Sequence, residues 1–249
     1  RPGTRTAAFS ISTAAFSIMN LLAIDTSADF CSVAASRGGA SFFRHERAVQ
    51  RHAEMILDAV QSVLAEAGLA LGDIEGIAFG AGPGSFTGLR VACGVTQGLA
   101  LARGIGVVGV STLLALADES AETCAAKSPS ARVIACIDAH MGEVYHAAYR
   151  KTATGWEVLH PPGVYKPDAV PEVPGDGWMG CGSGFAAHGG RVSRRYASQL
   201  AVLDPEAGPT ARALLRLARP RFEAGEVLDA ADAVPVYLRD KVAFKPGER

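Results

Sequence analysis

Acidic and hydroxyl side chains stand at the ends of two expected strands. Asp25, Thr26 and Ser27 follow an apolar run at residues 21–24, and Asp138 follows another at 133–137. Oxygen ligands at two facing strand ends can hold Mg²⁺ and phosphate groups, although Asp, Ser and Thr also form ordinary hairpin turns. These four residues are interpreted as a vestigial phosphate or nucleotide cleft, a pattern that favours nucleotide-binding ancestry and is no proof of present binding.

The glycine-rich run GAGPGSFTGLR, residues 80–90, precedes an expected helix. It has no Gly-Lys-Ser/Thr sequence, so it is not a P-loop, and Ser85 takes the place of the third glycine of a dinucleotide fingerprint counted from Gly80. Backbone N–H groups at a helix N-terminus can bind an anion, but a tight turn with close packing is the plainer interpretation. The run is therefore expected to begin a helix with Ser85 as its N-cap.

Metal-binding and nucleophile motifs are missing from the sequence. The six histidines form no HxxxH or HExxH pair, and the five cysteines form no CxxC pair, so no zinc site is predicted. Ser85 and Ser183 do not stand in a GxSxG motif. The odd number and wide spacing of the cysteines indicate a reducing compartment. The sequence thus predicts no metal ligand and no catalytic residue.

The composition is that of an ordinary globular protein. The chain has 249 residues, 49% hydrophobic, and a net charge of -1, which excludes a whole-chain electrostatic footprint for nucleic acid or an anionic membrane. The longest apolar stretch, residues 91–102, is shorter than the ~20 residues that a membrane span requires. Arg212, Arg216 and Arg219 share one side of an expected helix and are interpreted as a solvated face, with phosphate or acidic-partner contact as the alternative.

Two groups of elements must position these residues. In the first group, apolar patterns predict strands at 21–24, 31–35, 41–44, 74–79 and 107–110 and helices at 48–67, 85–102 and 111–117. The helix at 85–102 is apolar nearly all round, so it must bury two faces. Two pairs of glycines, Gly84 with Gly88 and Gly94 with Gly98, each have four-residue spacing. Each glycine costs about 0.5–1 kcal/mol relative to alanine, which favours close packing of another backbone.

The strand, acid, turn and strand pattern of the first lobe begins again after residue 120. IDAHMGEVY repeats the strand, acid, turn and strand of LAIDTSADFCSVA, which indicates a second lobe of related design. Residues 160–177 are expected to be mostly loop, and a helix is expected from Thr210 to Arg219, closed by Pro220. The predicted divisions are a leader or upstream extension at 1–18, an N-terminal lobe at 19–119, a C-terminal lobe at 120–243 and a loose tail at 244–249. The last helix of the C-terminal lobe is expected to be able to pack back on the first lobe.

Several segments, taken in order, resemble the TsaB (YeaZ) family of bacterial tRNA threonylcarbamoyladenosine biosynthesis proteins. They are LLAIDTSADFCSVA, GIAFGAGPGSFTGLRVACGVTQGLALA, VVGVSTL, IDAHMGEVYHAAY, GCGSG and PVYLRDKVA, spanning residues 21–243. GPGSFTGLR and DAHMGEVY are specific in combination. The resemblance implies an α/β, actin-like (ASKHA, RNase H-like) two-lobed fold with mixed sheets flanked by helices.

The resemblance also implies a role in a cytoplasmic complex. Members of the family are noncatalytic scaffold or activator subunits that work with the catalytic paralogue TsaD and the ATPase TsaE. The complex transfers threonylcarbamoyl to N6 of adenosine 37 in tRNAs reading ANN codons. The chain is thus expected to have no enzymatic activity and no cofactor of its own, to meet ATP and Mg²⁺ at the complex interface, and to reach tRNA through its partner.

The first two helices carry the partner contact in this family, and the same helices support a homodimer. The expected interface comprises His52, Met55, Ile56, Ala59, Val63, Phe86, Arg90, Val91, Gly94, Val95, Gly98 and Leu99. His140 stands where relatives often have arginine. Two other functions stay open: an independent ATP-binding hydrolase or kinase using Asp25 and Asp138, and a glycoprotease-like metallopeptidase.

Overall fold

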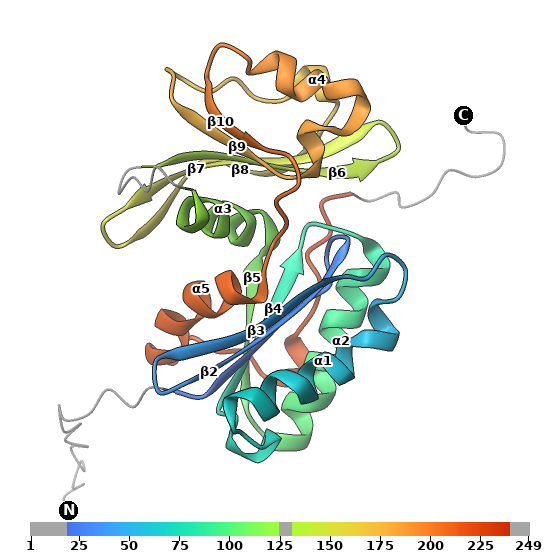
Figure 1. Ribbon diagram of the computed structural model, residues 1–249, viewed down its shortest axis with the longest axis vertical. Coiled ribbons are helices and arrows are strands. Elements are labelled where there is room, and N and C mark those ends of the chain that lie inside the picture. The colour runs from blue at the N-terminus through green and yellow to red at the C-terminus, as the bar shows by residue number, and fades with distance from the viewer. Residues whose placement is uncertain (1–18, 125–130, 240–249) are drawn as a thin grey trace, which may run out of the picture.

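The structure is a computed structural model that describes residues 19–124 and 131–239. The predicted leader, 1–18, and the predicted tail, 244–249, lie outside the described residues. The described chain forms two lobes, each built on a five-stranded sheet with helices packed against it (Figure 1). The predicted α/β fold with two mixed sheets is thereby confirmed. No helix within the described ranges is both long and apolar enough to cross a membrane.

The first sheet has the strand order β3-β2-β1-β4-β5. β1 runs antiparallel to β2 and parallel to β4. All five residues of β1 are buried, because helices cover both faces of this central strand, which explains its unbroken apolar run. The bounds are β1 (Leu21–Asp25), β2 (Phe30–Arg37), β3 (Ala40–Arg47), β4 (Gly76–Gly82) and β5 (Gly106–Ser111).

The second sheet repeats this topology. Its order is β10-β9-β6-β7-β8, and β6 again pairs antiparallel with the strand that follows it and parallel with the fourth strand of the lobe. The structural repeat predicted from IDAHMGEVY is thus confirmed. The bounds are β6 (Arg132–His140), β7 (Glu143–Thr152), β8 (Gly155–Tyr165), β9 (Trp178–Cys181) and β10 (Leu200–Asp204).

The helices form layers around the two sheets (Figure 1). α1 (His52–Ala67) and α2 (Phe86–Arg103) cover one face of the first sheet. α3 (Thr112–Thr123) and α5 (Ala211–Glu223) lie between the sheets, and α4 (Ala187–Arg195) lies on the outer face of the second. Short 3-10 helices are η1 (Leu71–Asp73), η2 (Pro167–Ala169), η3 (Ser183–Phe185) and η4 (Ala230–Asp232).

Four predicted helix caps agree with the structure. The Ser85 hydroxyl accepts a hydrogen bond from the Gly88 N–H, and Ser111 and Thr210 cap α3 and α5 in the same way. Gly68 ends α1 in the left-handed conformation, with φ of 63°. Local side-chain chemistry therefore decided where these helices begin and end.

Several predicted boundaries differ from the structure. The first helix begins at His52 rather than at residue 48, and α3 continues to Thr123 rather than ending at residue 117. α5 continues past Pro220 to Glu223, because Phe222 packs into the core over Gly76. The expected loop at 160–177 contains the end of β8, an edge strand in which prolines are tolerated. The boundary between residues 119 and 120 falls inside α3, which packs between both sheets.

Two of the three arginines predicted to form a solvated face of α5, Arg212 and Arg216, instead pair with two acids of α3. Arg216 forms ion pairs with Asp118 and Glu119, and Arg212 also pairs with Glu119. Both acidic side chains are at most 10% exposed. Burial raises the pKa of Glu119, but the two guanidinium groups outweigh this effect, and the net pKa is lowered. The network fixes α3 against α5 between the lobes.

Candidate functional site

The turn after β1 is closed by the beginning of α2. The Thr26 hydroxyl donates to the Gly88 carbonyl at 2.6 Å, and the Ser85 N–H donates to the Ser27 carbonyl at 2.7 Å. A Cβ atom on Gly88 would overlap the Thr26 carbonyl oxygen. The glycine therefore permits direct backbone packing, and the close-packing interpretation of the glycine run holds at this position.

The glycine run itself is divided among three elements. Gly80–Gly82 extends β4, Pro83–Ser85 forms the turn, and the remaining residues begin α2. The strand predicted to end at residue 79 thus continues to Gly82, because β4 pairs with β5 up to that residue.

The Asp25 carboxylate is buried beneath this turn and is 1% exposed. It accepts hydrogen bonds from the Ser27 N–H at 3.1 Å and from the Ser27 hydroxyl at 2.9 Å. Burial raises its pKa from 3.8 to about 6, and the bonds from Ser27 offset part of this increase. Asp25 and Thr26 are therefore packed below the cleft wall rather than lining it, whereas Ser27 reaches the cleft.

The raised pKa of Asp25 predicts a measurable pH dependence of stability. Because the folded pKa exceeds the ordinary 3.8, this group's contribution is fully present below pH 3.8 and is lost as pH rises through about 6. Asp25→Asn removes the titration. The free energy of unfolding of this variant relative to wild type should rise between pH 4 and pH 7 by roughly 2 kcal/mol. Urea denaturation of both proteins at the two pH values checks this, and a difference independent of pH would contradict it.

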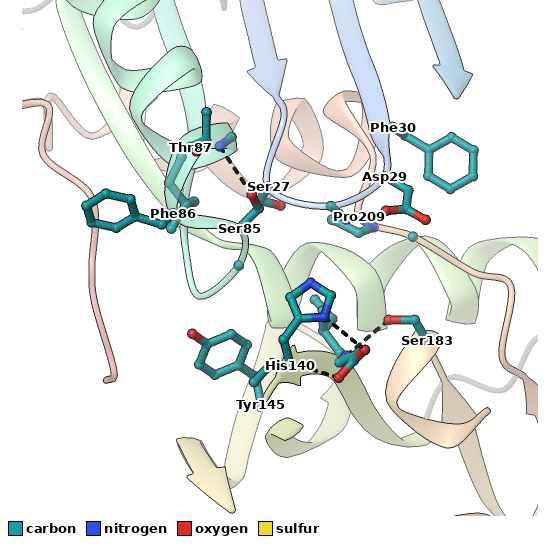
Figure 2. A pocket seen from close by; sticks show the side chains of 18 of the residues that line it. Ser27, Asp29, Phe30, Ser85, Phe86, Thr87, His140, Tyr145, Ser183 and Pro209 are labelled. Atoms are coloured by element: carbon teal, nitrogen blue, oxygen red, sulfur yellow. Dashed lines mark hydrogen bonds and ion pairs between the residues drawn. The ribbon is translucent and has the colours of Figure 1, made fainter. Parts of the chain in front are cut away.

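A cleft of about 960 Å³ separates the two lobes. Figure 2 shows Ser27, Ser85 and Thr87 on the first-lobe wall facing His140 and Ser183 on the second-lobe wall. The predicted pairing of two strand ends across one cleft is therefore present for Ser27 and Asp138, which both line it.

Asp138 is surrounded by donors from its own lobe. Its carboxylate accepts from the His140 N–H at 2.9 Å, lies 3.0 Å from His188 Nε2 and lies 3.2 Å from His140 Nδ1. Its main-chain N–H donates to the Ser183 hydroxyl. Asp138 lies within β6, not after it, because the strand continues to His140. The carboxylate thus stabilises the turn after β6.

That turn has an unusual backbone for residues with side chains. His140 and Met141 have φ of 57° and 53°, in the left-handed region, which non-glycine residues rarely adopt. Asp138 and His188 hold the turn from one side. Sequence spacing gave no signal for His188, because it lies 50 positions away from Asp138.

The outer surface of α1 and α2 carries the predicted partner contacts. His52, Met55 and Ala59 on α1 are half-buried, as are Val91, Val95 and Leu99 on α2, whereas Phe86, Arg90, Gly94 and Gly98 are exposed. Ile56 and Val63 are corrections to the predicted set. They are 1% and 0% exposed in the core against the first sheet, so they support the helix from inside and cannot contact a partner.

Two glycines on this surface have no neighbour to explain them. A Cβ atom on Gly94 or Gly98 would have no other heavy atom within 4 Å, in contrast to Gly84 and Gly88. Leu101, which the sequence interpretation omitted, continues the same side of α2 and is 75% exposed. Its spacing of three residues after Gly98 is the signal that could have included it.

Within residues 19–124 and 131–239, no group of three or more His, Cys, Asp and Glu side chains is placed to hold a metal ion. Histidines in the described residues instead make hydrogen-bond contacts within the fold. His52 contacts the Ala28 carbonyl, and His146 contacts the Tyr196 hydroxyl in the second-lobe core.

Comparison with known proteins gives consistent matches over most of the chain. A family model described as TsaD, tRNA N6-adenosine threonylcarbamoyltransferase, matches residues 43–243. The chain is 38% identical to tRNA threonylcarbamoyladenosine biosynthesis protein TsaB of Escherichia coli, over 92% of this chain and 100% of that protein. It is 32% identical to the Haemophilus influenzae protein of the same name, over 91% of this chain and 96% of that protein. A solved structure of YeaZ from Pseudomonas aeruginosa superposes with a TM-score of 0.78 and 37% identity, covering 89% of this chain and 100% of that one.

Proposed function

Because the chain belongs to the TsaB (YeaZ) family of tRNA threonylcarbamoyladenosine biosynthesis proteins, we propose that it is a noncatalytic subunit of the threonylcarbamoyl-transfer machinery. It binds a TsaD-like catalytic paralogue and, with a TsaE-like ATPase, supports modification of N6 of adenosine 37 in tRNAs reading ANN codons. The complex works in the cytoplasm.

The open glycines of α2 are the observation that carries this proposal. Gly94 and Gly98 each weaken the helix by about 0.5–1 kcal/mol relative to alanine, and nothing within the described chain packs on them. Half-buried Val91, Val95 and Leu99 flank them on the same helix. A helix of this kind is suited to close approach by another backbone, so this surface favours a helical partner.

The kind of partner follows from the family match. The matching model is that of the transferase itself and covers 201 residues, 43–243, so the catalytic subunit shares the lobe design of this chain. Two such lobes can pack through equivalent helices, burying apolar side chains of both. The same surface also allows self-association, which the paralogue then replaces.

The state of the cleft supports a noncatalytic role. Asp25 is sealed under the start of α2, and the Asp138 carboxylate is engaged by His140 and His188. Neither acid is therefore free to bind a cation in the cleft. In this proposal the chain needs no cofactor of its own. ATP and Mg²⁺ bind at the interface between the subunits of the complex, and the chain reaches tRNA through its partner.

Reconstitution tests the role directly. Purified TsaD-like and TsaE-like subunits, tRNA and threonylcarbamoyl adenylate are combined with and without this chain, and modified adenosine is measured by mass spectrometry of the digested tRNA. We expect multiple turnovers only when the chain is present, including as Asp25→Asn. Equal modification without the chain would refute the activator role. Turnover of Mg-ATP by the isolated chain, lost in Asp25→Asn, would instead support the kinase or hydrolase alternative.

A further inference from the structure

The C-terminal segment, residues 227–239, lies along α2 and then crosses to the second lobe (Figure 1). We name it the strap. It begins at the edge of the first sheet, where Leu228 forms a β-bridge with Val107. It then passes the cleft, which Val236, Tyr237, Leu238 and Arg239 help to line.

The first lobe holds the strap through backbone and side-chain contacts. The Gln97 side-chain amide donates to the carbonyls of Ala231 and Ala233, and Ala233 is fully buried. The Val236 N–H donates to the Ala81 carbonyl at 2.7 Å. The strap is thus a fixed part of the α2 surface.

The second lobe holds the other end through Arg239. Its guanidinium group forms an ion pair with Glu143 and donates to the Ala139 carbonyl at 3.0 Å. The Arg239 side chain is only 14% exposed. Because both ends are anchored, the intervening side chains have a defined position between the lobes.

The outward side chains of the strap are apolar and uncovered. Val234, Val236 and Tyr237 are 59%, 52% and 43% exposed. The Tyr237 ring packs on Phe86, with centroids 5.3 Å apart, and its hydroxyl accepts from Arg90 Nε. Arg90 also lies 3.9 Å from the Phe86 ring centroid and forms no ion pair with the described residues. The strap therefore joins the exposed end of α2 in one surface.

We propose that the strap is part of the partner-binding surface and that Val234, Val236 and Tyr237 contact the TsaD-like subunit together with α1 and α2. This rests on the proposed function. Exposed aromatic and arginine side chains such as Phe86, Tyr237 and Arg90 are of the types enriched in protein interfaces, and the exposed valines beside them add apolar surface that a partner can bury. The strap is continuous with the α2 surface through Phe86 and Arg90, and the unpaired guanidinium fits a carboxylate on the partner.

Calorimetric titration of the TsaD-like subunit into the full chain tests the strap. We expect Val236→Glu to raise the Kd at least tenfold, because it places a charge in an apolar contact. Tyr237→Ala should have a similar effect, because it removes the ring that packs on Phe86 and the hydroxyl that holds Arg90. Thermal unfolding of each variant shows whether it is folded, and Tyr237→Phe provides a milder change that keeps the ring.

Val158→Glu is the matched control, because Val158 is 53% exposed but lies on β8 in the second lobe. The Kd of this variant for the TsaD-like subunit should equal that of the wild-type chain. If Gly94→Arg prevents binding but Val236→Glu and Tyr237→Ala bind as tightly as wild type, the strap is not part of the interface and the proposed function stands. If wild type itself does not bind the TsaD-like subunit, both proposals fail.

Discussion

Gly94→Arg is expected to abolish binding of the TsaD-like subunit while leaving the chain folded. The position is helical and exposed, and no other heavy atom lies within 4 Å of a Cβ placed there, so the fold accommodates the side chain. A partner backbone packed on Gly94 would be displaced by the full length of an arginine. We expect a loss of about 100-fold or more in affinity, which corresponds to roughly 3 kcal/mol.

Analytical ultracentrifugation and calorimetry of the mixed subunits measure this effect. Ala201→Arg is the matched control, since Ala201 is an exposed small residue on β10 at the edge of the second sheet. This variant should form the complex with the TsaD-like subunit at wild-type affinity. If Gly94→Arg forms the complex at wild-type affinity and supports full tRNA modification, α2 is not the partner-binding helix.

Gly88→Ala is expected to destabilise the folded chain by roughly 3 kcal/mol or more. The added methyl group would overlap the Thr26 carbonyl oxygen, and a backbone oxygen in a buried turn cannot rotate away as a side chain can. Relief of the overlap would move α2 away from β1 and break the bond from the Thr26 hydroxyl to the Gly88 carbonyl.

The comparison variant is Gly94→Ala in the same helix. Nothing surrounds its Cβ, so the higher helix propensity of alanine should raise stability by about 0.5–1 kcal/mol. Urea denaturation of the two variants should therefore shift the midpoint in opposite directions. A shift of the same sign and size in both would mean that the glycines of α2 do not differ in their packing.

Gly88 and Gly94 also show a feature that the sequence did not predict, namely what packs against each glycine. The four-residue spacing within each pair, Gly84 with Gly88 and Gly94 with Gly98, predicted close backbone packing for all four glycines. The structure divides them, since the first pair packs against the turn after β1 and the second pair packs against nothing in the described chain. Spacing places residues on a helix face, but it cannot specify what lies opposite that face.

The candidate cleft shows the same limit. The sequence placed Ser27 and Asp138 at the ends of two related strands, because the repeated strand, acid and turn pattern is local. In the structure Ser27 lies in the turn after β1, whereas Asp138 lies within β6, and both line the cleft. It did not reveal that Asp25 is sealed beneath α2 or that His188 contacts Asp138. Burial and pairing of this kind depend on segments 50 or more residues apart.

By itself, the sequence determined the glycine-rich start of α2 and its Ser85 cap. It also determined the order of the apolar strands along the chain and the repetition of one strand, acid and turn pattern in the two lobes. These features depend on side chains within a few positions of one another, where hydrogen bonding and periodic burial act directly. Only the tertiary structure decided that Ile56 and Val63 belong to the core, that Arg216 joins α5 to α3, and that the strap carries Tyr237 to Phe86. Each of these depends on which surfaces meet when the sheets and helices pack, and that is a property of the whole fold.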